Sequence, residues 1–493
     1  MTSPPPLPDL RGLVAGSDWV AGRPGLPAAA ARWQRELPPV RAKLEREALL
    51  LARPRVWIDT VGTLLGTGWR MASTAAPDAP LQILTAAAGA FGLPVAPQGR
   101  GALRSAEEIV RAGGPAYVKL GQFIASADGL LPPEWVNAFA WCRDKVPPVD
   151  GAEAIVRAEL GDAFDLLADF APDSFAAASI GQVHRARLKE GTDVVVKVRR
   201  PGLRRSFAAD VEALALVAAA AHRLHEGVRI ANLPGFVELF AQLALQELDF
   251  RLEALNMVEL GVCFEDAGLE YCTFPRPIPG MVTERVLVME AVPGVPFSEA
   301  RDTYGAALDG DRLLELAITG VLEGTLAYGR FHGDLHAGNV LIDGPASFSL
   351  VDFGICGRLD ARQRAALVRF LLGFAAMDAN RQLDALEEFG ALPPGTDRTA
   401  LAAALQHEID NLPADGVTVD RLGESIGGVV RALSAHGFST PKELVLFFKN
   451  LLYLSGFTAA VAPDADLMAQ IGPVLAYFTE KYGDELIQMA MAV

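Results

Sequence analysis

Two aspartates and an asparagine in the C-terminal half of the chain have a spacing that could bring them together at one site that binds a cation. Asp334 and Asn339 are five residues apart in FHGDLHAGNVLI, and Asp352 follows Asn339 by thirteen residues in VDFG. A short loop would present Asp334 to a hydroxyl group, and a hairpin would return Asp352 to the cation that Asn339 faces. Phosphoryl transfer needs a carboxylate that orients or deprotonates the nucleophile, and oxygen ligands for Mg²⁺. The spacing therefore predicts phosphoryl transfer, with Asp334 catalytic and with Asn339 and Asp352 as ligands of Mg²⁺.

A lysine upstream of these residues is placed to bind nucleotide phosphates. Lys197 lies in VVVKV, a strand pattern that would bury its stem and carry its ammonium to the α- and β-phosphates. Such a lysine needs an orienting carboxylate from a following helix, for which Glu253 is preferred and Glu247 is the rival. A His-x-Asp-x-x-x-x-Asn loop before a hairpin that ends in Asp-Phe-Gly is the signature of the protein-kinase-like fold. We therefore expect ATP and Mg²⁺ as cofactors.

The loop before the strand of Lys197 is rich in alanine where kinase-like folds place glycines. Glycine allows close backbone approach and positive φ, so alanines predict a stiffer phosphate-covering loop. Taken alone, the same segment resembles the start of a helix. The loop residues expected to cover the nucleotide are Ala176, Ala177, Ala178, Ser179, Ile180, Gly181, Gln182 and Val183. The linker expected to bond adenine, for which a plain internal strand is the alternative, is Met289, Glu290, Ala291 and Val292.

Composition limits the function further. The chain has 493 residues, of which 51% are hydrophobic and 21% charged, so it can bury a sizeable core. Lys and Arg total 44 against 60 Asp and Glu, and a net charge of −16 without a basic stripe excludes nucleic acid as the expected partner. Four scattered cysteines indicate neither a disulfide scaffold nor a zinc ribbon, and they favour a reducing compartment. The N-terminus has no signal-peptide pattern, so we expect a cytoplasmic protein.

The first 70 residues differ from the rest because they carry ten Lys and Arg against six Asp and Glu. Trp33, Trp57 and Trp69 lie among these basic residues, a combination that suits an interfacial membrane helix. A helix that packs on the domain is the alternative. Peripheral contact with the anionic inner face of a membrane therefore stays open. A later apolar stretch, 451–463, is too short to span a membrane, and the final residues, YFTEKYGDELIQMAMAV, are not expected to span either.

The surrounding elements predict an α+β chain with two kinase-like lobes. Apolar runs on either side of turns predict hairpins around 190–192 and 343–346, and a buried strand is expected at 283–292. Helices are expected at 152–160, 204–225, 236–260 and 311–330, and throughout the chain after Asp360. The predicted domains are a variable helical region at 1–100, a helical extension at 101–150, an N-lobe with inserted helices at 151–293, and a largely helical C-lobe at 294–493.

Further motifs resemble those of one kinase-like family. Lys119, Gly121 and Gln122 match a Lys-x-Gly-Gln motif, and Glu247 and Asp249 match a Glu-x-Asp motif. Together with AAASIGQVHRA, HGDLHAGN and DFG, these motifs make residues 100–460 resemble the UbiB/AarF family of atypical kinase-like proteins, which includes the coenzyme Q accessory kinases.

The resemblance implies that the extension lies across the mouth of the active site and occludes it. Lys119 would pair there with Glu247, Gln122 would bond to Asp249, and Glu253 would pair with Lys197. The implied activity is hydrolysis of Mg-ATP or phosphoryl transfer linked to isoprenoid lipid or quinone metabolism at a membrane surface. The implied partners are small molecules or enzymes of such a pathway.

The catalytic loop departs from the family pattern. The family usually has Asp-Pro-His-Pro-Gly-Asn, whereas this chain has Asp-Leu-His-Ala-Gly-Asn, with neither proline. This loop sequence is closer to that of small-molecule phosphotransferases of the aminoglycoside or choline kinase type. Such a phosphotransferase activity is one alternative function. A nucleotide-binding scaffold without turnover is the other.

Overall fold

The computed structural model describes residues 3–53, 104, 107–108, 110–111, 115–125, 133–143, 149–177, 180–224, 233–392, 395–410, 441–465 and 467–491. The chain divides into two compact units. The first combines residues 1–35, 253–279 and 290–493, and the second combines 36–252 and 280–289. Helices and strands occur in both units, so the chain is α+β as predicted.

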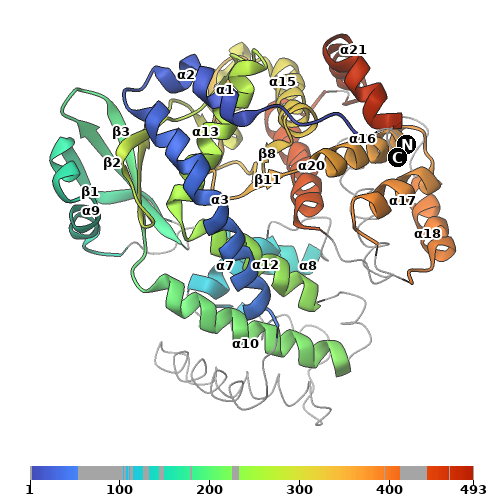
Figure 1. The fold of residues 1–493 in the computed structure, drawn as a ribbon, viewed down its shortest axis with the longest axis horizontal. Helices are drawn as coiled ribbons and strands as arrows, with labels where there is room; N and C mark the ends of the chain where they lie inside the picture. The colour runs from blue at the N-terminus through green and yellow to red at the C-terminus, as the bar shows by residue number, and fades with distance from the viewer. Residues whose placement is uncertain are drawn as a thin grey trace. The chain divides into compact units, whose positions relative to one another are not determined.

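A five-stranded sheet holds the strand lysine of the second unit (Figure 1). Its order is β1 (Leu167–Ala177), β2 (Gly181–Leu188), β3 (Asp193–Arg199), β6 (Val286–Glu290) and β5 (Pro277–Val282). The predicted hairpin is confirmed, because β2 and β3 are antiparallel with Val183 opposite Lys197. Gly191 closes their turn with a φ of 95°, a left-handed conformation that favours glycine. The predicted strand at 283–292 is confirmed as β6.

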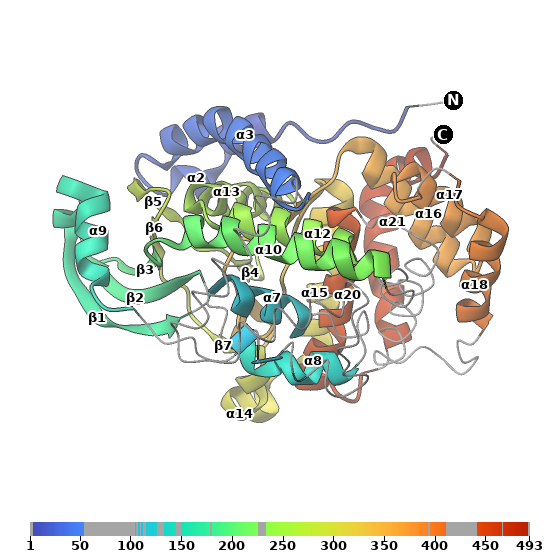
Figure 2. The same ribbon diagram turned by 90° about the horizontal axis from the view of Figure 1, so that it is seen from below.

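The helices of the second unit include three that contact one another side by side in both views (Figures 1 and 2): α7 (Pro115–Ala125), α10 (Leu203–Leu224) and α12 (Leu233–Glu247). Shorter helices are α8 (Pro133–Phe139), η1 (Ala140–Arg143), α9 (Ala152–Leu160) and η2 (Gly161–Leu166). The helices predicted at 152–160 and 204–225 are thus confirmed.

The single helix predicted at 236–260 is wrong, because the chain breaks at Leu248 and Asp249. The helix α12 ends at Glu247, and α13 (Phe250–Asp266) begins after Asp249. The Asp249 carboxylate accepts a hydrogen bond from the Arg251 backbone N–H at 3.2 Å, which is how an aspartate stabilises a helix start. Apolar periodicity continues through this break and conceals it.

The first unit contains two small sheets and most of the remaining helices. One sheet has the order β4 (Cys272–Thr273), β10 (Ser347–Leu350), β9 (Val340–Gly344) and β7 (Val295–Pro296), and the other pairs β11 (Cys356–Arg358) with β8 (Arg330–His332). The second predicted hairpin is confirmed, since β9 and β10 are antiparallel with Val340 opposite Leu350. The predicted helix at 311–330 ends early, because β8 already begins at Arg330.

The helices of the first unit agree with the predicted helical C-terminal region. Asp360 caps α16 through a reciprocal capping box with Gln363. These helices are α1 (Leu10–Gly16), α2 (Asp18–Ala21), α13, α14 (Ala300–Tyr304), α15 (Gly310–Leu322), α16 (Ala361–Ala375), α17 (Ala379–Glu388), α18 (Arg398–Asp410), α20 (Lys442–Val461) and α21 (Leu467–Met491), with the short turns η3 (Phe297–Glu299), η4 (Gly305–Ala307) and η5 (Glu323–Ala327).

One N-terminal tryptophan packs within the first unit. Trp33 is 3% exposed at the start of α3 (Leu26–Leu51), a helix that continues into the second unit. Nearby, the Trp19 backbone N–H donates to Glu265 of α13 at 2.7 Å. Trp57 and Trp69 lie outside the described residues, so membrane contact by this region stays a prediction.

Among the described residues, α20 is the one helix that is long and apolar enough to cross a membrane, judged by length and composition alone. It is longer than the apolar stretch that the sequence indicated. Core helices of soluble proteins have the same features, and 56% of its apolar window is buried within the protein. Its buried residues include Lys449 and Asn450, which lie beside the candidate catalytic loop.

Candidate functional site

The candidate catalytic loop of the first unit begins at a buried histidine. The Asp334 backbone N–H donates to His332 Nδ1 at 3.1 Å, so His332 Nε2 carries the hydrogen that bonds to the Val351 carbonyl at 3.1 Å. Burial lowers the pKa of His332, which favours this neutral form. His332 therefore ties the start of the loop to the segment that carries Asp352.

The two predicted Mg²⁺ ligands flank the β9–β10 hairpin, with Asn339 just before β9 and Asp352 just after β10. The Asn339 amide donates to the Asp334 carbonyl at 2.9 Å, and the Val351 N–H donates to the Asn339 carbonyl at 3.0 Å. Asp352 has a φ of 61°, a left-handed conformation that is uncommon outside glycine and concentrates at functional sites.

This donor set fits magnesium. With the Asn339 amide nitrogen engaged, its oxygen is the atom suited to a cation, and the Asp352 carboxylate is the second ligand. The described residues contain no group of three His, Cys, Asp or Glu that could hold a metal. Mg²⁺ commonly takes only one or two carboxylates and completes its octahedron with phosphate and water. A single carboxylate with an amide oxygen therefore suits Mg²⁺ that arrives with a nucleotide.

Asp334 is held by two residues that sequence reasoning missed. Lys449 Nζ lies 2.8 Å from Asp334 Oδ1, and the Tyr453 hydroxyl donates to the same oxygen at 3.0 Å. Both side chains come from α20, whose Asn450 amide also donates to the His332 carbonyl. The sequence held one signal of this contact, which is the lysine inside the apolar run LVLFFKNLLYL. An apolar run indicates burial, and lysine is almost never buried without a partner.

A small cavity lies beside this loop. Its volume is about 40 Å³, and its walls include His332, Leu335, Asn450 and Tyr453. Sites for drug-sized ligands usually measure about 300–1,000 Å³. This cavity is therefore too small to be the nucleotide site.

In the second unit, the strand lysine and the alanine-rich segment adopt hairpin geometry. Lys197 Nζ lies 5.4 Å from the centroid of the Phe250 ring, a cation–π distance. The segment is not a helix start, because Ala176 pairs with Val183 and Ala177 with Gln182 across β1 and β2. Ala178 and Ser179 lie outside the described residues.

Two residues of this segment have structural roles that the sequence did not indicate. A Cβ on Gly181 would lie 2.8 Å from the Val198 carbonyl oxygen, so only glycine lets the strands approach. Gln182 was expected to bind the nucleotide, but its amide oxygen accepts from the Val149 N–H at 2.7 Å and its amide nitrogen donates to the Val149 carbonyl at 2.9 Å. The amide nitrogen also lies 3.0 Å from His184 Nε2, so Gln182 clamps the chain at Val149 rather than presenting its amide to a phosphate.

The Lys-x-Gly-Gln motif packs α7 against its neighbours. The predicted ion pair is confirmed, with Lys119 Nζ 2.7 Å from Glu247. A Cβ on Gly121 would lie 2.3 Å from Cys142 Sγ, so the glycine permits contact with η1. Gln122 donates to the Cys142 carbonyl at 2.9 Å.

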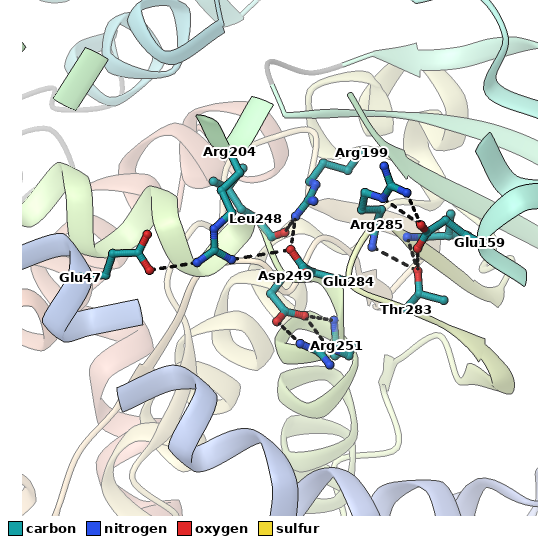
Figure 3. A network of polar contacts seen from close by, with 11 residues as sticks. Glu47, Glu159, Arg199, Arg204, Leu248, Asp249, Arg251, Thr283, Glu284 and Arg285 are labelled. Atoms are coloured by element: carbon teal, nitrogen blue, oxygen red, sulfur yellow. Dashed lines mark hydrogen bonds and ion pairs between the residues drawn. The ribbon is translucent and has the colours of Figure 1, made fainter. Parts of the chain in front are cut away.

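The predicted Gln122–Asp249 bond is wrong, because Asp249 accepts from Arg251 instead. The nearest guanidinium nitrogen of Arg251 lies 2.7 Å from the Asp249 carboxylate, and that carboxylate raises the pKa of Arg251 (Figure 3). The adjacent Leu248 carbonyl accepts from Arg199, whose guanidinium also lies 3.0 Å from Glu284. These contacts therefore fix the Glu-x-Asp segment at the junction between α12 and α13.

The predicted linker crosses the division between the units, which falls between Met289 and Glu290. The Glu290 N–H donates to the Arg276 carbonyl at 2.9 Å, while Ala291 and Val292 follow β6. Glu253 is 2% exposed in the first turn of α13. The pairing of Lys197 with Glu253, and the adenine contact of residues 289–292, stay predictions.

The strand lysine, the aspartate–asparagine loop and the Asp-Phe-Gly turn define a kinase-like protein. The ABC1 atypical kinase-like domain matches residues 142–386. An uncharacterized protein of Mycobacterium tuberculosis is 36% identical over 369 residues, which cover 72% of this chain and 74% of that protein. An uncharacterized chloroplastic aarF domain-containing protein kinase of Arabidopsis thaliana is 32% identical over 383 residues, 72% and 71% of the two chains. A probable protein kinase UbiB of Pseudomonas putida is 29% identical over 382 residues, 76% and 70% of the two chains. The chain belongs to the UbiB/AarF family of ABC1 atypical kinase-like proteins.

Proposed function

We propose that the protein uses Mg-ATP and either hydrolyses it or transfers its γ-phosphoryl group. The arrangement of Asp334, Asn339 and Asp352 supports this proposal, because Asn339 bonds to the Asp334 carbonyl and His332 links Asp334 to the segment that carries Asp352. Asp334 would orient the acceptor hydroxyl or water, and Lys197 with Glu253 would bind the phosphates. Mg²⁺, when bound, neutralises charge on the phosphates.

The Lys-x-Gly-Gln helix restricts the acceptor in this proposal. The Lys119–Glu247 ion pair and the close packing of Gly121 on Cys142 support a fixed α7. A fixed extension would exclude peptide substrates and leave water or a small molecule as acceptor. We place the reaction in isoprenoid lipid or quinone metabolism on the cytoplasmic face of a membrane, on the strength of the family resemblance and the basic N-terminal region.

The test is Mg²⁺-dependent ATP turnover by the full-length protein, with and without anionic liposomes. The proposal expects turnover that rises with liposomes and disappears when Mg²⁺ is chelated. Nucleotide binding without turnover in either condition would favour a scaffold. The HGDLHAGN sequence of the loop makes aminoglycosides and choline a second set of acceptors to assay, although the family relatives favour the UbiB type.

A further inference from the structure

Two side chains of α20 meet one oxygen of the candidate catalytic aspartate. Lys449 Nζ and the Tyr453 hydroxyl lie 2.8 and 3.0 Å from Asp334 Oδ1. Residues four apart in a helix lie on the same face, so one turn of α20 supplies both contacts. His336 Nε2 lies 3.9 Å from the other oxygen, Oδ2, and the His336 ring meets the Tyr453 ring edge-on with centroids 6.3 Å apart. The two carboxylate oxygens therefore have different surroundings.

The lysine keeps its charge although it is buried. Lys449 is 5% exposed. Burial by itself lowers the pKa of Lys449, but the Asp334 carboxylate and Tyr453 outweigh burial and raise it well above its ordinary value. A buried ammonium is costly unless it is paired, so this contact is built into the fold rather than optional.

The helix α20 has docking contacts other than Lys449. Apolar residues of α20 such as Leu446, Phe447 and Leu454 are buried, and Asn450 already bonds to the His332 carbonyl. A structural lysine–carboxylate pair also exists elsewhere in this unit, where Lys481 lies 2.8 Å from the buried Glu323. What distinguishes Lys449 is that its partner is the carboxylate expected to meet the acceptor.

We propose that Lys449 and Tyr453 are positioning residues that fix the rotation of Asp334, so that Oδ2 meets the acceptor. This inference rests on the proposed function. In the step that it serves, the acceptor oxygen bonds to the γ-phosphorus of ATP while the bond from that phosphorus to the ADP oxygen breaks. The acceptor proton passes to Asp334 Oδ2 and then to solvent.

The test compares full-length variants by kcat, KM for ATP and nucleotide Kd. Lys449→Met is expected to lower kcat by about 100-fold, because misplacement of a catalytic group by about 1 Å costs that much. KM and Kd should stay within about twofold, because Lys449 is not assigned to the nucleotide. Lys449→Arg should recover part of kcat by restoring a cation. Tyr453→Phe, which keeps the ring and the packing, should lower kcat by about fivefold, roughly the worth of one hydrogen bond.

A matched control is Lys442→Met, at the first residue of α20, where Nζ lies 3.6 Å from Glu443. It should leave kcat unchanged. One outcome would overturn this inference alone: the wild type turns over ATP, Asp334→Asn abolishes that turnover, and Lys449→Met and Tyr453→Phe preserve it. Absence of turnover in the wild type would overturn the proposed function and, with it, this inference. Equal losses in kcat and in nucleotide affinity would assign Lys449 to a structural role and also overturn it.

Discussion

Two lysine–carboxylate pairs, one in each unit, have nearly the same geometry but different origins in the sequence. Lys119 and Glu247 lie 2.7 Å apart in the second unit, and Lys449 and Asp334 lie 2.8 Å apart in the first. The first pair joins two motifs and was predicted. The second joins the candidate catalytic loop to a helix that carries no recognised motif. Similar contacts thus carry different consequences, because one carboxylate fixes a helix and the other is the expected catalytic group.

Removing the expected metal ligand of the first unit, Asp352, should have the largest effect on turnover. Asp352→Ala takes away the carboxylate that would hold Mg²⁺, and several kcal/mol of charge stabilisation correspond to a loss of roughly 1,000-fold in kcat. Measurement of ATP turnover over a Mg²⁺ titration checks this. Unchanged turnover at saturating Mg²⁺ would remove Asp352 from the metal site.

The two lysines should respond differently to the same substitution. Lys449→Met is expected to cost about 100-fold in kcat. Lys119→Met should change kcat by less than about tenfold and instead alter nucleotide preference or autophosphorylation, because its partner Glu247 belongs to the segment that is expected to occlude the active site. A panel of nucleotides assayed on both variants makes the comparison. An inert Lys119→Met would contradict the expected occlusion of the active site.

Packing at the Lys-x-Gly-Gln motif predicts a smaller effect, which is on stability rather than on turnover. Gly121→Ala would bring a methyl group against Cys142 Sγ, and overpacking typically destabilises by about 1–3 kcal/mol. Burial raises the pKa of the Cys142 thiol to about 12, so it stays neutral at the contact. Denaturant unfolding of Gly121→Ala, with Cys142→Ala as the compensating change, measures the effect. Failure of Cys142→Ala to restore stability would contradict the steric account.

The smallest expected effect is on the pH dependence of the unfolding free energy, and it comes from His332. Burial lowers the pKa of His332 in the folded protein, so below about pH 6.5 the unfolded chain binds a proton that the folded chain refuses. The contribution of His332 to stability is therefore complete above the unfolded pKa and falls as pH drops toward the folded pKa. His332→Asn should reduce the dependence of the unfolding free energy on pH between pH 7 and 5. An equal dependence in both proteins, measured by denaturant unfolding, would contradict it.

Local patterns predicted much of the fold and part of the candidate site. Alternating apolar residues around turns marked both hairpins, and these position Lys197 and Asp352. The motifs marked Lys119 and Glu247. The break at Leu248 was missed because apolar periodicity continues through it, and a capping aspartate is one residue in a long pattern. The roles of Gln182 and Lys449 were missed because their partners, Val149 and Asp334, are 33 and 115 residues away. No periodicity encodes such contacts.

The most direct test of the account is Mg-ATP turnover by the wild type beside Asp334→Asn, with nucleotide Kd measured on both. Asparagine keeps the shape of the side chain but loses the negative charge that would orient the acceptor and take up its proton. The account predicts measurable turnover in the wild type, loss of at least about 100-fold in the variant, and a similar Kd in the two proteins. Equal turnover in both proteins would contradict the assignment of Asp334 as the catalytic carboxylate.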